Sequence, residues 1–199
     1  MSSSRELRAA LPSLLLPSPD LSSAPDAALA AVLVPILIST PDPRVVFTKR
    51  TDTLSRHAGE ISFPGGLADD GEDAASAALR EAEEELGLAP RDVQLVGSLP
   101  PVHTKVTGIL IVPFVGLLEK EPQFTPNADE IAEILEFPLS HLMATGAEAE
   151  FEHEGRSFRT HVYEVNGHVI WGATARILWS FVELLGPGRG RDSMGAVPA

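Results

Sequence analysis

The stretch that most constrains this chain is GGLADDGEDAASAALREAEEELGL, residues 65–88. The Gly pair predicts a turn, and residues 72–87 have the spacing of a helix. At roughly 100° per residue, four apolar positions of this helix fall within about 60° of each other and form a narrow stripe suited to packing on a sheet. These positions are Ala75, Leu79, Ala82 and Leu86. We expect Asp69 or Asp70 to cap the start of the helix and Gly87 to end it.

The opposite side of the same helix carries clustered carboxylates. Spacings of three and four residues make Glu81, Glu84 and Glu85 neighbours, whereas Glu83 points elsewhere, into solvent. Negative charge near the C-terminal end of a helix is disfavoured by the helix dipole. A solvated helix face is one explanation of this cluster. A hard cation explains more of it, because Mg²⁺ and Mn²⁺ take oxygen ligands from carboxylates, phosphates and water. We therefore predict that Mg²⁺ or Mn²⁺ binds here.

Composition narrows the class of protein. The chain has 199 residues, 44% of them hydrophobic and 22% charged, which suits one globular domain. It has no cysteine, which excludes disulfide scaffolds, thiolate zinc sites and cysteine nucleophiles and fits a reducing, cytoplasmic location. The formal net charge of -13 argues against partners such as nucleic acid or an anionic membrane surface. We expect a cytoplasmic protein whose partner is a small molecule, with a divalent cation between the two if that molecule is anionic.

Strand-like and helix-like segments alternate through the middle of the chain. The strand-like segments are residues 30–38, 44–50, 93–100 and 108–118, followed by a hairpin at 156–172. Pro113 suggests that its strand is an edge strand or carries a bulge. The hairpin should turn at Asn166-Gly167. Residues 128–143 mix a strand with a short helix, and residues 173–185 form a closing helix that stops at Gly186. This pattern predicts a mixed α/β (α+β) domain.

The two ends of the chain differ from its middle. Residues 1–25 are rich in Ser and Pro, and we expect a flexible segment there with one short helix over Ser4–Ala10. Residues 187–199 have little to pack and predict a flexible tail. The folded domain is therefore expected over residues 26–186.

Residues 66–88 resemble the signature of the Nudix hydrolases. That signature is Gly, five residues, Glu, seven residues, Arg-Glu, an apolar residue, any residue, Glu-Glu, any residue, Gly and an apolar residue. The matching positions are Gly66, Glu72, Arg80, Glu81, Ala82, Glu84, Glu85, Gly87 and Leu88. Every specified position is met, although Ala82 is smaller than the usual Ile, Leu or Val. The resemblance implies a Nudix-type α/β/α sandwich with a mixed central sheet and a catalytic loop-helix-loop that cleaves a diphosphate joined to another group.

The resemblance also implies roles for these side chains. It assigns Glu81, Glu84 and Glu85 to the divalent metal. Arg80 and Glu72 would form an ion pair that holds the loop and orients the glutamates. The metal would neutralise the diphosphate and lower the pKa of a bound water that attacks phosphorus. Gly66, Glu72 and Gly87 would be the structural members of the motif.

A carboxylate close to the metal would take the proton of the attacking water. Glu130 lies in a stretch where relatives often place an extra carboxylate near the metal, although an exposed charge leading into a strand explains it equally well. The candidate catalytic set is therefore Glu81, Glu84, Arg80 and Glu130.

Residues 45–66 resemble a further motif that precedes the signature in the coenzyme A diphosphatase branch of the family. The matching positions are Thr48, Arg50, His57, Ala58, Gly59, Phe63, Pro64, Gly65 and Gly66. One arginine of that motif is replaced here by Ser55, and Arg56 follows it. Basic side chains beside a diphosphate site favour anion binding over plain surface charge, and coenzyme A carries a 3′-phosphate as well as its diphosphate. The basic residues are Lys49, Arg50, Arg56 and His57.

Two later segments, residues 98–116 and 169–182, resemble the same branch. Lys105 and His103 are candidates to line the substrate pocket, with a plain loop role as the alternative. Trp171 and Trp179 are expected in the core, and Arg176 on the surface. The predicted substrate-binding set is Arg50, Arg56, His57, Gly65, Gly66 and Lys105.

The resemblance thus implies cleavage of coenzyme A, in its free, oxidised or acylated form, to 3′,5′-ADP and 4′-phosphopantetheine or its derivative. The nearest alternative is a Nudix hydrolase of ADP-ribose, a dinucleotide polyphosphate or a nucleoside triphosphate. A catalytically silent Nudix-fold binding module would predict a degraded signature, and an acidic cation-buffering protein would carry its carboxylates through its loops. Neither description fits residues 66–88.

Overall fold

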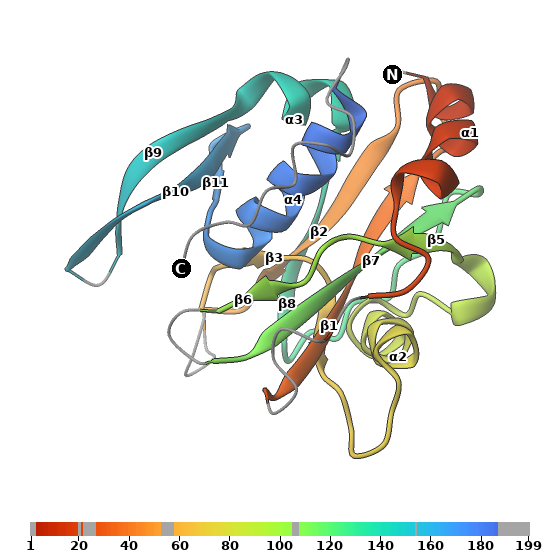
Figure 1. Cartoon of the computed structure of the whole chain (residues 1–199), viewed down its shortest axis with the longest axis horizontal. Coiled ribbons are helices and arrows are strands. Elements are labelled where there is room, and N and C mark those ends of the chain that lie inside the picture. Colours follow the sequence, from red (N-terminus) through yellow and green to blue (C-terminus); the bar gives the residue numbers. More distant parts are fainter. Residues whose placement is uncertain are drawn as a thin grey trace.

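The computed structural model describes residues 3–19, 21, 27–52, 58–104, 108–153 and 155–186. Along the chain (Figure 1) the elements are α1 (Ser4–Leu14), β1 (Leu29–Leu37), β2 (Arg44–Arg50), β3 (Ile61–Ser62), β4 (Gly65–Leu67), α2 (Ala74–Leu86), η1 (Pro90–Asp92), β5 (Gln94–Ser98), β6 (Val102–His103), β7 (Leu110–Leu118), β8 (Ile131–Pro138), α3 (Leu139–Thr145), β9 (Gly146–His153), β10 (Arg156–Val165), β11 (His168–Ile170) and α4 (Gly172–Leu185). No helix among these residues is both long and apolar enough to cross a membrane.

The main sheet is mixed and contains β1 to β8. Its principal order is β3-β2-β1-β7-β5, with β4 paired to β1, β6 to β7 and β8 to β2. The central strands β1 and β7 run parallel, from the pair Leu29–Leu110 to the pair Leu37–Leu118. The other strand pairs of this sheet are antiparallel. The α/β class and the mixed central sheet predicted from the sequence are confirmed.

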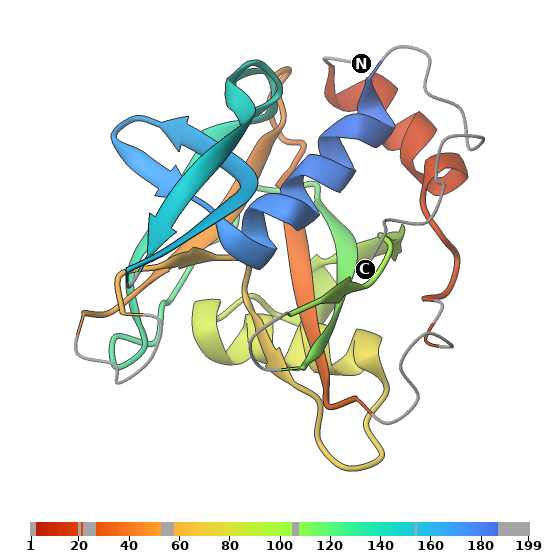
Figure 2. The same cartoon turned by 60° about the vertical axis from the view of Figure 1, so that its left-hand side comes forward.

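Helices cover both faces of this sheet (Figure 2). Strand residues alternate between the two faces, so Leu33 packs in one apolar cluster with Ala78 and Leu86 of α2. Val34, the next residue of β1, packs in the other cluster with Phe181 of α4. Because α1 also contributes to the second cluster, the arrangement is a three-layer sandwich with α2 alone on its own side.

The N-terminal segment is more ordered than the sequence suggested. Helix α1 runs from Ser4 to Leu14, four residues beyond the predicted Ser4–Ala10. Leu7 and Leu11 on this helix are 1% and 0% exposed and belong to the same cluster as α4. The prediction of a flexible segment is therefore wrong for these residues, since their leucines fill the sandwich on the α4 side. The predicted tail, residues 187–199, lies outside the described residues.

Pro113 does not place its strand at an edge. β7 has β1 along one side and β6 and β5 along the other. Pro113 falls between the β6 pairing, which reaches Ile111, and the β5 pairing, which begins at Phe114. Its missing N–H therefore interrupts no ladder on that side, and its carbonyl accepts a hydrogen bond from the N–H of Leu99 at 2.9 Å.

A second sheet, of order β11-β10-β9, extends beside α4 (Figure 1). Its β10–β11 hairpin turns at Asn166 and Gly167 with φ angles of 51° and 80°, as predicted. The strand β9 was not predicted; it pairs with β10 from Gly146–Tyr163 to His153–Arg156. The expected strand and short helix of residues 128–143 are β8 and α3, and the expected closing helix is α4.

Candidate active site

The loop and helix of residues 65–88 form as the local sequence predicts, except that a different aspartate caps the helix. The side chain of Asp73 accepts hydrogen bonds from the N–H groups of Ala75 and Ser76 at 3.1 and 3.0 Å and is the N-cap of α2. The predicted caps, Asp69 and Asp70, are wrong because the helix begins only at Ala74. Gly87 ends it with φ 68°, as predicted.

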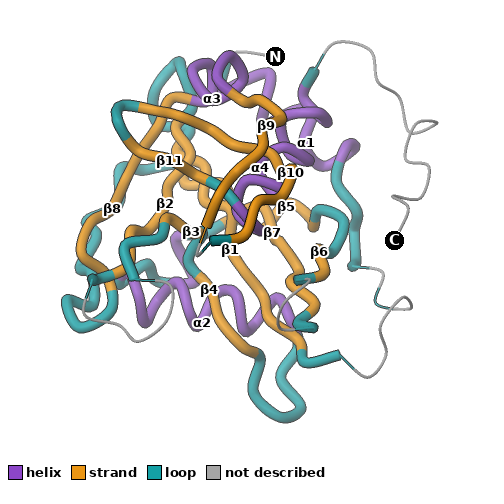
Figure 3. Tube along the Cα trace, turned by 90° about the vertical axis from the view of Figure 1, so that its left-hand side faces the viewer, coloured by secondary structure: helices purple, strands orange, loops and turns teal. Residues whose placement is uncertain are grey.

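β4 passes close to α2 (Figure 3) and pairs with β1, and its two glycines make room for these two approaches. A Cβ on Gly66 would lie 2.6 Å from the carboxyl carbon of Glu81. Gly65 has φ 154°, and a Cβ there would lie 2.3 Å from the carbonyl oxygen of Ala31 in β1. The backbone therefore requires glycine at Gly65, whereas Gly66 leaves room for the carboxylate of Glu81.

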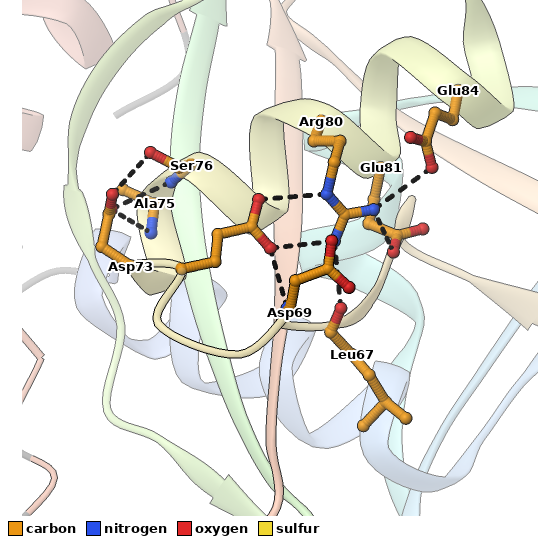
Figure 4. A network of polar contacts seen from close by, with 9 residues as sticks. Leu67, Asp69, Asp73, Ala75, Ser76, Arg80, Glu81 and Glu84 are labelled. Carbon is orange, nitrogen blue, oxygen red and sulfur yellow. Dashed lines mark hydrogen bonds and ion pairs between the residues drawn. The ribbon is translucent and has the colours of Figure 1, made fainter.

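Arg80 organises the glutamates, as Figure 4 shows. Its Nε and Nη2 donate to the two carboxylate oxygens of Glu72, each at 3.0 Å, and Nη2 also donates to the carbonyl of Leu67 at 3.0 Å. Its Nη1 donates to Glu81 at 2.8 Å and to Glu84 at 3.2 Å. The hydrogen bonds from Arg80 hold the pKa of Glu72 below its ordinary value. This is the ion pair that the Nudix resemblance implies.

Glu85 is the buried carboxylate of the site. Its side chain is only 6% exposed, and the N–H of Gly65 donates to it over a long 3.3 Å. Burial raises the pKa of Glu85 to about 7, because the ionised form loses most of its hydration. Burial likewise raises the pKa of Glu81. A nearby positive charge would stabilise both carboxylates.

The loop before β8 brings a further carboxylate to this point. The N–H of Asn127 donates to the carbonyl of Glu85 at 2.9 Å. The N–H of Thr125 donates to the carbonyl of Leu86 at 2.8 Å. These bonds close the C-terminal end of α2 and place Glu130, which precedes β8, beside the helix.

Arg50, the last residue of β2, lies between the buried and the downstream carboxylate. Its Nη1 is 3.7 Å from Oε1 of Glu85, and its Nη2 is 3.9 Å from Oε2 of Glu130. The charges of Glu81 and Glu130 both act on Glu85 and raise its pKa, whereas the charge of Arg50 lowers it. Two carboxylates, one from α2 and one from the loop before β8, thus lie within 4 Å of one guanidinium.

The donors of α2 suit a hard divalent cation. Glu81 and Glu85 are one turn apart and turned towards β4, and Glu84 is exposed between them on the same side. Among the residues that the structure describes, no three acidic or histidine side chains already converge as a metal site. Instead, Arg80 contacts Glu81 and Glu84, and Arg50 contacts Glu85. Oxygen ligands, a buried carboxylate and clustered negative charge are the chemistry that Mg²⁺ or Mn²⁺ requires.

Three of the six residues predicted to bind substrate are not described by the structure. Arg56, His57 and Lys105 are outside the described residues. Arg176 is not a free surface charge: its Nη1 donates to the carbonyl of His103 at 2.8 Å and so ties α4 to β6. Trp179 packs against the core, as expected, and stacks on the ring of His161.

Sequence reasoning missed two features of the site. Asp73 as the cap is a local feature that the run Asp73-Ala74-Ala75-Ser76 could have revealed. The contact of Arg50 with Glu85 joins residues 35 positions apart and has no local signal.

Comparisons with known proteins agree with this geometry. The NUDIX domain family matches residues 29–159. The chain is 41% identical over 152 residues to the Nudix hydrolase NudL of Pectobacterium atrosepticum, which is called uncharacterized; the match covers 75% of this chain and 78% of that protein. NudL of Escherichia coli K12, also called uncharacterized, is 38% identical over the same length and coverage.

Among solved structures, a MutT/nudix family protein from Enterococcus faecalis has a TM-score of 0.50 at 15% identity, covering 83% of this chain and 63% of that one. This likeness concerns the fold. The sandwich and its glutamate-bearing loop-helix-loop define a hydrolase of phosphoric anhydrides. The chain belongs to the Nudix family.

Proposed function

We propose that this protein hydrolyses the diphosphate bond of coenzyme A, with Mg²⁺ or Mn²⁺, to 3′,5′-ADP and 4′-phosphopantetheine; oxidised or acylated coenzyme A would react in the same way. The observation that carries this proposal is the contact of Arg50 with the buried Glu85. It joins the motif of residues 45–66, which resembles the coenzyme A diphosphatase branch, to the carboxylates of the Nudix helix.

The carboxylates of the site take two roles, as ligands of the cation and as acceptor of a proton. Glu81, Glu84 and Glu85 would hold the cation, which supplies charge neutralisation and an acidic water when bound. The N–H of Gly65 orients Glu85, and Arg80, anchored on Glu72, orients the other two. Glu130 has 45% of its side chain exposed beside this set and is our candidate to take the proton of the attacking water.

Positive charge beside the carboxylates favours a substrate with several phosphates. Arg50 reaches the carboxylates from the strand that leads into residues 53–57, where Arg56 and His57 lie in the sequence. We assign these three and Lys105 to the phosphates of coenzyme A, whose 3′-phosphate needs a cationic contact beyond those of the diphosphate. We include Gly65 and Gly66 in the substrate-binding set because they lie beside the buried Glu85 and Glu81 and carry no side chain that would block a phosphate.

The test is turnover of purified protein with coenzyme A and, separately, ADP-ribose, with and without Mg²⁺ or Mn²⁺, with products identified by mass. Metal-dependent release of 3′,5′-ADP and 4′-phosphopantetheine is expected. Glu85→Gln should lose this activity, whereas Glu83→Gln, an exposed position on the same helix, should retain it. Cleavage of ADP-ribose with coenzyme A left intact would overturn the choice of substrate and leave the family assignment standing.

A further inference from the structure

Arg50 and Arg80 both contact carboxylates of the site, but in different ways. Arg80 makes hydrogen bonds of 2.8 to 3.2 Å to glutamates of its own helix and loop and to the carbonyl of Leu67. The nitrogen atoms of Arg50 are 3.7 Å from Glu85 and 3.9 Å from Glu130, beyond hydrogen-bond distance. Arg80 is therefore fixed in place, whereas these contacts of Arg50 are electrostatic and easily exchanged.

The backbone aims Arg50 at the site. Alternation along β2 places Val46, Thr48 and Arg50 on one face, and Val46 packs in the cluster of α2. The register between β2 and β8 shifts between Lys49 and Arg50. The extra residue at this shift, Ala132, belongs to β8, so the alternation along β2 continues through Arg50. Arg50 is thus held over the C-terminal half of α2 by the sheet itself.

The charge that Arg50 supplies is the charge that a divalent cation would supply. Glu85 is buried, and the negative charges of Glu81 and Glu130 act on it. Arg50 offsets that charge from the side of β2. Two cations that stabilise the same carboxylates compete, so each weakens the binding of the other.

We propose that Arg50 is an exchangeable counter-ion: it holds Glu85 and Glu130 while no divalent cation is bound, and cation binding frees it to contact the anionic substrate. This inference rests on the proposed function, because it takes the carboxylates of α2 as the metal site. It adds that metal and substrate binding are coupled through one side chain, with the metal preceding productive contact between Arg50 and substrate.

Direct binding of Mn²⁺ without substrate tests this, measured by electron paramagnetic resonance of the free ion. Arg50→Gln should bind Mn²⁺ about fivefold more tightly or better than wild type, because the competitor is gone. Arg8→Gln is the matched control. Arg8 lies on α1 and forms an exposed ion pair with Glu119, so this variant removes the same charge far from the site and should leave the Mn²⁺ affinity unchanged. Equal or weaker binding by Arg50→Gln would overturn the proposal.

Two further variants keep the test decisive. Arg50→Lys keeps one charge but loses the fork that reaches both carboxylates, so its affinity should lie between those of wild type and Arg50→Gln. If Arg50→Gln does not fold, Arg50→Lys decides, since affinity no tighter than wild type overturns the proposal. Glu85→Gln separates the two ideas. If it binds Mn²⁺ like wild type, the metal site itself is wrong; if it loses Mn²⁺ while Arg50→Gln gains nothing, only the counter-ion proposal fails.

Discussion

The carboxylate of Glu81 occupies the space that a side chain on Gly66 would fill, since a Cβ there would lie 2.6 Å from the carboxyl carbon of Glu81. The contact is with the end of a flexible side chain, whereas the neighbouring Gly65 faces backbone atoms of β1. The two glycines of one dipeptide therefore serve different ends. One makes room for a functional group, and the other lets two strands approach.

Gly66→Ala should displace Glu81 and spare the fold. We expect metal affinity and kcat/KM to fall by about 10- to 100-fold, the range for disturbing the support of a metal ligand, with little change in Tm. Gly65→Ala is the contrast and should destabilise the protein by about 1–3 kcal/mol, because it strains a glycine-only backbone conformation. Activity assays and urea unfolding of both variants measure this. Equal losses of stability in the two would contradict it.

Arg80→Lys should weaken metal binding although it keeps the charge. Lysine cannot reproduce the paired bonds from Nε and Nη2 to Glu72 while also reaching Glu81. A loss of about 10- to 100-fold in metal affinity is expected by calorimetric titration. Arg91→Lys, at an exposed position of η1, is the control and should behave like wild type. An unchanged affinity in Arg80→Lys would mean that charge alone suffices.

Glu85→Gln should separate stability from metal binding. Burial of the charged form is unfavourable, as the pKa of about 7 indicates, so the amide should leave the metal-free protein at least as stable as wild type at pH 8. Wild type should gain about 2.7 kcal/mol when Mg²⁺ or Mn²⁺ is present at 100 times its Kd. Thermal unfolding with and without metal measures both effects. A full metal-dependent gain in Glu85→Gln would remove this residue from the metal site.

His161 should make stability sensitive to acid. Its ring stacks on Trp179 with centroids 4.2 Å apart, and its Nδ1 is buried without a hydrogen-bond partner among the described residues. Burial lowers its pKa against the attraction of Glu148 on β9 and Glu183 on α4, and Arg176 on α4 lowers it further. The folded protein thus favours the neutral ring, and this contribution is present above pH 6.5, the ordinary histidine pKa, and lost as pH falls below it.

His161→Phe keeps an aromatic ring on Trp179 without a titrating group. Its free energy of unfolding should fall less than that of wild type between pH 7.5 and pH 5, measured by urea denaturation. The exposed His141→Phe serves as control and should keep the wild-type slope. The same slope in all three proteins would rule His161 out as the source.

Leu11→Ala should show that α1 belongs to the folded core. Leu11 is 0% exposed, and truncation of a buried leucine costs about 2–5 kcal/mol. Arg5→Ala, at an exposed position on the same helix, should cost far less. Chemical denaturation of the two variants checks this, and a Leu11→Ala protein as stable as wild type would show that α1 is not needed.

Much of the site could be predicted from the sequence because its determinants are local. The helix over residues 74–86, its end at Gly87 and the Arg80–Glu72 pair depend on spacings within one loop and one helix. The same holds for the hairpin at Asn166, whose φ of 51° reflects a two-residue turn. Asp73 shows the limit of this reasoning, since several acids near a helix start compete and the first helical turn decides between them.

What the sequence by itself determined was the donor set and its register: which carboxylates lie on one side of α2 and which glycines precede them. Only the tertiary structure decided which of them is buried, because burial of Glu85 depends on β4 and on the loop before β8 closing over the helix end. Tertiary structure also placed Arg50 and Glu130 together and drew α1 into the core. These outcomes depend on contacts between distant segments, and such contacts leave no periodic pattern in the chain.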